Sequence, residues 1–270
     1  MKKTIIYILT FILSIFIILL IGLILADTTI LNEKYIIKKM EKSNYYQKIY
    51  DITNEDFKKH TLQSGFGDEI IDNIIDKEII KEDINSLVGT IYTKSGYTIH
   101  SQEIRSRLET NIENKIKTGR YVITEGDKSN IETFKNTIVK AYANNIIYGE
   151  SIVDVLKSTV TKVNSLMNMI YIGILFVIIV LIVLLNTIDK DKKVQFLQVA
   201  LLTTGLFFIF VSLFMRIGVN FDNILMFNKE ISKLFINIIN NILLYMGLVG
   251  AVVISLIIIK NLIWKGKSNG

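Results

Sequence analysis

Four long apolar runs dominate the pattern of hydrophobic and polar positions along the chain. They cover Thr4–Ala26, Asn168–Ile188, Val194–Met215 and Leu234–Ile259, and none contains a charged residue or a histidine. An α-helix rises about 1.5 Å per residue, so each run is long enough to cross a hydrocarbon core of about 30 Å. The pattern therefore predicts four transmembrane helices.

The stretch from residue 27 to residue 167 has a different pattern. Its apolar residues recur every three or four positions, as on one face of an amphipathic helix. The clearest sets are Ile80, Ile84, Leu87, Val88 and Ile91; Ile104, Leu108, Ile112 and Ile116; and Ile131, Phe134, Ile138, Val139 and Tyr142. We predict a bundle of five to six helices, with strand-like connectors at 90–100, which includes a turn at 94–96, and at 120–124.

Capping residues predict where some of these helices begin and end. Ser129 and Ser151 each precede an acidic residue by three positions, the pattern of a helix start. Helix ends are predicted at Gly65, Gly67, Gly96, Gly119 and Gly149. No proline or other strong breaker interrupts 152–188, which predicts one helix that continues into the second span. The polar residues between Asp27 and Asn32 predict a helix break after the first span.

The predicted fold is thus all-α: a four-helix transmembrane bundle with a helical extracytoplasmic domain inserted between the first and second spans. The predicted parts are an N-terminal transmembrane helix (1–26), the helical domain (27–167) and a three-span membrane region (168–270). That region comprises spans 168–188, 194–215 and 234–259, a turn at 189–193, an outer loop at 216–233 and a tail at 260–270.

Lysines predict the orientation of these spans. Four crossings place the N-terminus, the turn and the tail on one side of the membrane, and these short segments hold eight lysines and two acidic residues. The positive-inside bias makes that side cytoplasmic, so both termini lie in the cytoplasm and 27–167 lies outside a plasma membrane. The first apolar run is longer than the core of a signal peptide, so we expect an uncleaved anchor.

Composition excludes several kinds of chemistry. The chain has no cysteine, which rules out disulfides, thiolate metal sites and a thiol nucleophile. The eight cytoplasmic lysines and two acidic residues account for the whole net charge of +6, so the charge is a topology signal and not a nucleic-acid patch. We expect no nucleic-acid partner and no cofactor.

Side chains that could carry catalysis lack the spacing that catalysis needs. His60 and His100 are the only histidines and do not form a metal-binding pattern. The acidic pairs Glu55-Asp56, Asp68-Glu69 and Glu82-Asp83 could serve a hydrolase or bind Ca²⁺, but the simpler interpretation is a solvated helix face. We therefore predict no enzyme activity and no catalytic, cofactor or metal site.

Two kinds of interaction site are predicted. Tyr45 and Tyr46, with Phe221 and Phe227 in the outer loop, are possible partner surfaces, and core packing or burial at the membrane interface is the alternative. Small residues that allow close helix approach, or self-association, are Gly247, Ala251 and Ser255 in the fourth span and Gly22 and Ala26 in the first.

Three stretches resemble features of uncharacterised four-span membrane proteins of AT-rich Gram-positive bacteria: Asn44–Tyr50, the Gln63-Ser64-Gly65 turn and Ile79–Asn85. The resemblance implies the same layout of spans and no particular activity.

Our leading interpretation is an envelope interaction or assembly factor whose extracytoplasmic domain senses or binds a partner. Its expected partners are the lipid bilayer and other membrane or envelope proteins, with a second copy of the chain as a further candidate. The alternative is a small channel or transporter component that works as an oligomer, although the spans lack the ionisable residues that coupled transporters use. An extracytoplasmic hydrolase comes third.

Overall fold

A computed structural model describes residues 2–93, 96–119, 123–147, 150–190, 192–221 and 229–268. Throughout these residues the secondary structure is helical, without strands, as predicted. The chain divides into two compact units. We call residues 1–32 and 163–270 the apolar unit, and residues 33–162 the polar unit.

The apolar unit holds the helices that are long and apolar enough to cross a membrane. They are α1 (Lys2–Thr28), the second part of α7 (Glu150–Ile188), α8 (Lys193–Gly218) and α9 (Lys229–Ser268). Each predicted span lies inside one of them, and α7 is continuous from Glu150, as the sequence predicted. These four helices are consistent with an integral, multi-pass membrane protein.

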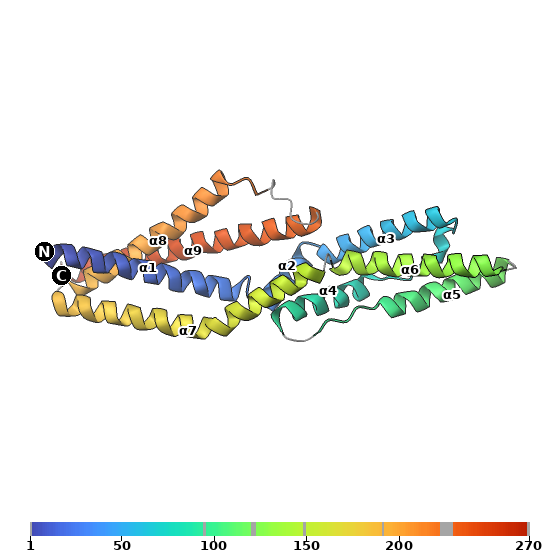
Figure 1. The fold of residues 1–270 in the computed structure, drawn as a ribbon. Helices are drawn as coiled ribbons and strands as arrows, with labels where there is room; N and C mark the ends of the chain where they lie inside the picture. The colour runs from blue at the N-terminus through green and yellow to red at the C-terminus, as the bar shows by residue number, and fades with distance from the viewer. Residues whose placement is uncertain are drawn as a thin grey trace. The chain divides into compact units, whose positions relative to one another are not determined.

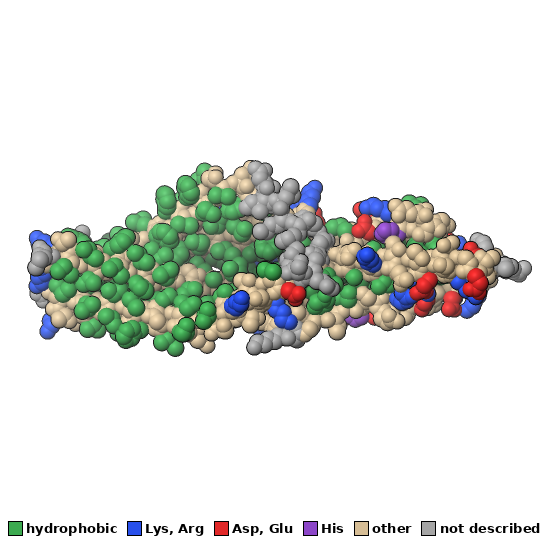
Figure 2. Space-filling model, viewed as in Figure 1, with side chains coloured by type: hydrophobic (Ala, Val, Ile, Leu, Met, Phe, Trp, Pro, Cys, Tyr) green, Lys and Arg blue, Asp and Glu red, His purple; other side chains and the backbone are tan. Residues whose placement is uncertain are grey.

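Both ends of the apolar unit's chain lie close together. Figure 1 shows the start of α1, the end of α9 and the α7–α8 turn at the same end of the unit. Lysines gather there, and hydrophobic side chains cover the surface of the helices beyond them (Figure 2). The structure thus brings the lysine-rich segments to one end, which the orientation prediction requires.

Helices α8 and α9 form a close antiparallel hairpin. A Cβ atom added to Gly250 would lie 2.5 Å from the carbonyl oxygen of Gly205, so these glycines let the two backbones touch. One to two turns further on, the Ser212 hydroxyl donates to the Leu243 carbonyl at 2.6 Å. Near the other end, the Gln198 amide donates to Asn261 at 2.9 Å.

Helix α1 packs against α7 and α8 through a small apolar cluster. Its buried members are Ile6, Leu13, Ile17, Leu181, Leu185 and Ala200. Beside this cluster the buried hydroxyls of Thr10, Ser14 and Thr204 each donate to a carbonyl four residues earlier in their own helix. The interior of this unit therefore holds hydroxyl and small residues as well as leucine and isoleucine.

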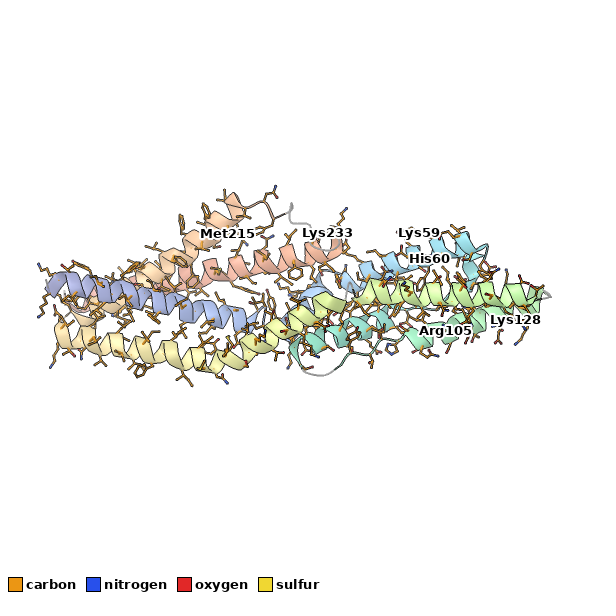
Figure 3. All side chains as sticks on the ribbon, viewed as in Figure 1. Lys59, His60, Arg105, Lys128, Met215 and Lys233 are labelled. Carbon is orange, nitrogen blue, oxygen red and sulfur yellow. The ribbon has the colours of Figure 1, made fainter. Side chains whose placement is uncertain are left out.

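The polar unit is a helical bundle with a buried core. It comprises α2 (Glu33–Lys42), α3 (Tyr45–Ser64), the short 3₁₀ helix η1 (Asp68–Ile70), α4 (Lys77–Tyr92), α5 (Ser101–Gly119), α6 (Glu125–Ile147) and the start of α7. Most of the apolar residues predicted to face the core from α4, α5 and α6 are buried, with Ile80, Leu108 and Ile138 fully enclosed. Ile91, Ile116, Ile131 and Val139 are half-buried. Charged side chains such as Lys59, Arg105 and Lys128 project from it (Figure 3).

Two predicted helix starts are wrong by a few residues. Helix α6 begins at Glu125 and not at Ser129, because Thr124 and Asp127 cap it reciprocally. The Asp127 N–H donates to the Thr124 hydroxyl at 3.3 Å, and the Thr124 N–H donates to the Asp127 carboxylate at 2.9 Å. Helix α7 begins at Glu150, so Ser151 lies inside its first turn.

The predicted connectors contain no strand among their described residues, and the turn predicted at Lys94-Ser95 lies outside the described residues. The break after the first span is confirmed, because α1 ends at Thr28 and α2 starts at Glu33.

Candidate functional site

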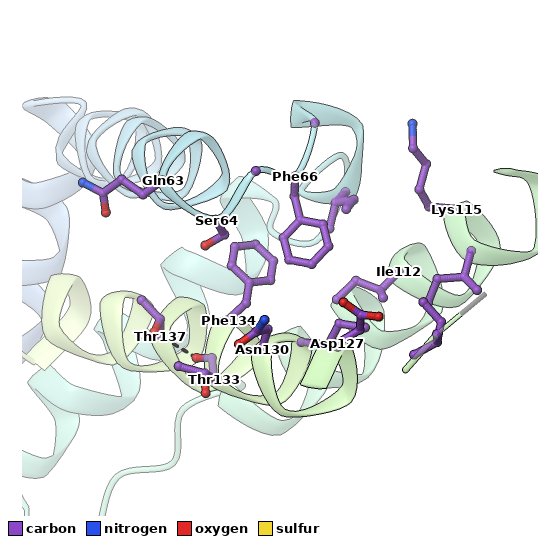
Figure 4. A pocket seen from close by; sticks show the side chains of 16 residues that line it. Gln63, Ser64, Phe66, Ile112, Lys115, Asp127, Asn130, Thr133, Phe134 and Thr137 are labelled. Atoms are coloured by element: carbon purple, nitrogen blue, oxygen red, sulfur yellow. Dashed lines mark hydrogen bonds between the residues drawn. The ribbon is translucent and has the colours of Figure 1, made fainter. Parts of the chain in front are cut away.

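The polar unit has a pocket where the end of α3 meets η1, α5 and the first half of α6 (Figure 4). Its volume is about 700 Å³, within the range of about 300–1,000 Å³ that is usual for ligand sites. Helix α3 enters the unit at Tyr45 and reaches the pocket at Gln63, about 27 Å away along the helix at 1.5 Å per residue. The pocket therefore lies at the opposite end of α3 from the end that follows α2.

The end of α3 shapes one wall of this pocket. Gly65 has a left-handed backbone with φ of 73°, and its N–H donates to the Leu62 carbonyl while the N–H of Phe66 donates to Thr61. This paired arrangement ends the helix at the predicted glycine. It also turns the chain so that Phe66 lies against Phe134 of α6, with 4.7 Å between the ring centroids.

The floor of the pocket is apolar. Ile70, Ile112 and Phe134 are buried, and Phe66, Ile116 and Ile131 are only half-buried. Asn111 on α5 fixes the position of Ile70, because its amide donates to the carbonyls of Ile70 and Asp72, each at 2.9 Å. The half-buried Phe66 ring and the side chains of Ile116 and Ile131 offer apolar surface that a ligand could cover.

The rim of the pocket is polar and rich in hydrogen-bond acceptors. The hydroxyls of Ser64, Thr133 and Thr137 donate to carbonyls four residues earlier in their own helices, at 2.8 to 2.9 Å. Their oxygens can therefore only accept a further bond. Gln63 and Asn130 have carboxamides with no hydrogen-bond partner among the described residues, so both can donate and accept.

The two charged residues that line the pocket are already engaged. Lys115 forms an ion pair with Glu69, and Asp127 belongs to the cap of α6. Hydrogen bonds from Thr124 hold the pKa of Asp127 below its usual value, so this carboxylate stays ionised near neutral pH.

A second polar cluster lies inside the bundle, around the carboxylate of Asp83 on α4. This side chain is fully buried. It accepts a hydrogen bond from the Tyr142 hydroxyl on α6, another from the backbone N–H of His100 at 2.9 Å, and it contacts the His100 ring through Nδ1. The carboxylate thus joins α4, α6 and the segment that leads into α5.

This cluster shifts the protonation of its partners. The hydrogen bond to Asp83 raises the pKa of His100, with the charges of Asp83, Glu103 and Glu82 adding to the effect. Burial, and then the contact with Asp83, raises the pKa of Tyr142 well above its usual value. The protonated form of His100 is favoured beside the Asp83 side chain, because this contact stabilises the positive charge of the ring.

The Glu82-Asp83 pair is therefore not the solvated helix face that we predicted. Glu82 is exposed as expected, but Asp83 is completely buried. The sequence did contain a signal, since Asp83 occupies the apolar stripe of α4 between Ile80 and Leu87. An acid on a buried stripe needs hydrogen-bond partners, and Tyr142 on the apolar face of α6 is one of them.

Tyr45 and Tyr46, predicted as partner surfaces, lie in the interior of the polar unit. They are 6% and 3% exposed, and their rings contact edge to face at 6.4 Å. The Tyr46 hydroxyl donates to Asn85 at 2.6 Å, and burial raises the pKa of Tyr46 to about 12. Their place is in the core, the alternative considered for them. Phe221 is half-buried after α8, and Phe227 lies outside the described residues.

The predicted small residues of α9 differ in what they contact. Gly247 faces α8, where an added Cβ would be 2.9 Å from the Ser212 hydroxyl, whereas Ala251 and Ser255 are exposed. In α1, Gly22 and Ala26 are half-buried, and an added Cβ at Gly22 would meet no neighbour within 4 Å. The closest approach of α8 and α9 uses Gly205 and Gly250 instead, which were not predicted.

Comparison of the chain with protein-family models, with curated proteins and with solved structures gave no significant match.

Proposed function

We propose that this is a plasma-membrane protein that displays its polar unit outside the cytoplasm and uses it to bind another protein of the cell envelope. The observation that carries the proposal is the contrast between the two units. The lysine-rich start of α1, the α7–α8 turn and the end of α9 lie at one end of the apolar unit, and the charge-balanced polar unit carries a pocket with an apolar floor.

Two features support binding by the pocket end of the polar unit. The pocket leaves Phe66, Ile116 and Ile131 partly exposed, and Leu62, next to the pocket residue Gln63 in the chain, is 73% exposed. A partly exposed apolar floor inside a polar rim is the usual anatomy of a binding surface.

Site-specific photo-crosslinking in living cells tests this proposal. A photoreactive phenylalanine at Gln63, on the pocket rim, should give one discrete adduct, and the same residue at exposed Asn114 on α5 should not. Equal labelling at both positions would contradict a defined partner site. Recovery of an uncrosslinked monomer from both would contradict the proposal as well.

A further inference from the structure

The hydrogen-bonding state of the pocket rim restricts what the pocket can hold. Three hydroxyl oxygens, those of Ser64, Thr133 and Thr137, can only accept, and the carboxamides of Gln63 and Asn130 add two more acceptor oxygens. Acceptors therefore outnumber free donors. A complementary ligand brings N–H or O–H groups, whereas a phosphate or carboxylate, which only accepts, could use the carboxamide N–H groups but not the three hydroxyl oxygens.

The charged residues of the lining also disfavour an anionic ligand. Lys115 already pairs with Glu69, which offsets its positive charge. Asp127 is ionised but is bound by Thr124 in the α6 cap. The lining thus offers no free positive charge, and an anionic ligand has little to gain there.

The floor selects the apolar part of the ligand. The tilted Phe66 and Phe134 rings and the side chains of Ile70, Ile112 and Ile131 form a surface that suits a bulky aromatic or branched side chain. A volume of about 700 Å³ has room for such a side chain and for some of the backbone that flanks it.

An apolar side chain flanked by uncharged N–H donors is the chemistry of a peptide segment. We propose that the pocket receives a bulky apolar side chain of a partner polypeptide, and that peptide N–H groups beside it donate to the acceptor-rich rim. A lipid chain would fill the floor and leave the rim oxygens unused. This inference rests on the proposed function and adds to it the chemistry of the partner.

Titration of the full-length protein in nanodiscs with N-acetyl-phenylalaninamide tests the inference. The natural chain has no cysteine, so Leu62→Cys, at an exposed position beside the pocket, gives a unique site for a fluorine label. The expected result is a saturable change in the ¹⁹F signal. The double variant Gln63→Ala/Asn130→Ala should weaken binding about tenfold, because it removes two hydrogen-bonding groups.

A matched control and two further probes make the outcome decisive. Gln102→Ala/Asn114→Ala removes the same side-chain types from exposed positions on α5 outside the pocket and should leave the affinity unchanged. A probe whose amide nitrogens are methylated should bind about tenfold more weakly, because it lacks the N–H donors. Equal binding of the methylated probe, or saturation by dihexanoylphosphatidylcholine alone, would overturn the peptide assignment.

The titration does not depend on membrane orientation. An absent ¹⁹F response with successful crosslinking at Gln63 would refute the peptide chemistry and leave the proposed function standing. A saturable response in a protein whose polar unit faces the cytoplasm would refute the proposed function and leave the peptide chemistry of the pocket standing.

Discussion

The two units of the molecule distribute their side chains in opposite ways. In the polar unit, Phe57, Ile49 and Tyr142 are fully enclosed, and ion pairs such as Lys81–Glu41 lie on the surface. In the apolar unit many large side chains point outward, such as Phe176 and Phe210, which are 65% and 67% exposed, although Phe208 and Leu13 are enclosed. The closest contacts between its helices are made by Gly205, Gly250 and Ser212.

The difference shows which solvent each unit is built for. Water drives large apolar side chains into a core, and this drives the folding of the polar unit. Lipid tails are as apolar as leucine, so helices in a bilayer gain nothing by hiding leucine and associate through close packing and hydrogen bonds. One chain therefore follows two packing rules, and each rule makes its own predictions.

The largest expected difference in stability is between removing an enclosed aromatic ring and removing an exposed one. Phe57→Ala should destabilise the polar unit by about 3–5 kcal/mol, because it leaves a cavity in an enclosed core. Phe210→Ala in α8 should cost less than about 1 kcal/mol, since lipid can fill the space. Denaturant titration in micelles measures the loss of stability in both variants, and amide hydrogen exchange assigns each loss to a unit. Equal losses of stability would contradict the difference between the two units.

Next in size is the contact between α8 and α9. Gly250→Leu places side-chain atoms against the Gly205 backbone and should destabilise the hairpin by about 2–3 kcal/mol. Its neighbour Ala251 is exposed, so Ala251→Leu is the matched control and should be nearly neutral in a monomer. Resistance of the α8–α9 pair to unfolding in micelles reports the first effect.

The oligomeric state in nanodiscs adds a second readout for Ala251→Leu. If Ala251→Leu abolishes an oligomer that the natural protein forms, the result would support the prediction that Ala251 and Ser255 contribute to self-association. A neutral Gly250→Leu variant would contradict the close packing of α8 and α9.

The buried carboxylate is expected to matter somewhat less. Asp83→Asn weakens the acceptor for the Tyr142 hydroxyl and for the His100 N–H and ring, which should cost about 2 kcal/mol in the free energy of unfolding of the polar unit. Glu82→Gln changes the exposed neighbouring acid and should be close to neutral. Denaturant midpoints of the two variants decide the point, and similar midpoints would mean that burial of Asp83 has no energetic role.

The smallest effect is the dependence on pH. A raised pKa of His100 in the folded protein means that its contribution to stability is complete below the ordinary value of about 6.5 and disappears as pH rises through the folded pKa. Asp83, Glu82 and Glu103 act on the charge of this ring, and the Tyr142 hydroxyl donates to Asp83. The polar unit should therefore become less stable as the pH increases from about 6.5.

Thermal unfolding between pH 6 and pH 9 measures this slope. His100→Gln should flatten it, whereas His60→Gln, which removes the only other histidine, should preserve it. A slope that survives His100→Gln would show that another group is responsible.

Periodicity predicted most of the fold because it reports burial directly. The apolar stripes of α4, α5 and α6 and the four long runs could hardly form anything but helices, and Gly65 could be recognised as a helix end. Thr124 was missed because Ser129 offers a similar capping pattern five residues later. Asp83 was missed because its acidic neighbour Glu82 suggested a solvated pair, although its place on the apolar stripe marked it as buried.

Other features depend on tertiary structure and have no local signal. All faces of α9 are apolar, so no periodicity shows which face meets α8, and Gly250 could not be chosen over Gly247, Ala251 and Ser255. The pocket forms where residues from four elements meet, and the hydrogen-bonding state of its hydroxyls follows from helix geometry. Tyr45 and Tyr46 equally suit a surface or a core until their neighbours are known.

The most direct test of the account is the accessibility of single cysteines in intact cells. Because the natural chain has none, Asn114→Cys reports only the polar unit and Lys190→Cys reports only the turn between α7 and α8. A membrane-impermeant maleimide should label the cysteine at 114 in intact cells, and the one at 190 only after permeabilisation. Labelling of both from the same side would contradict a polar unit displayed outside the cytoplasm.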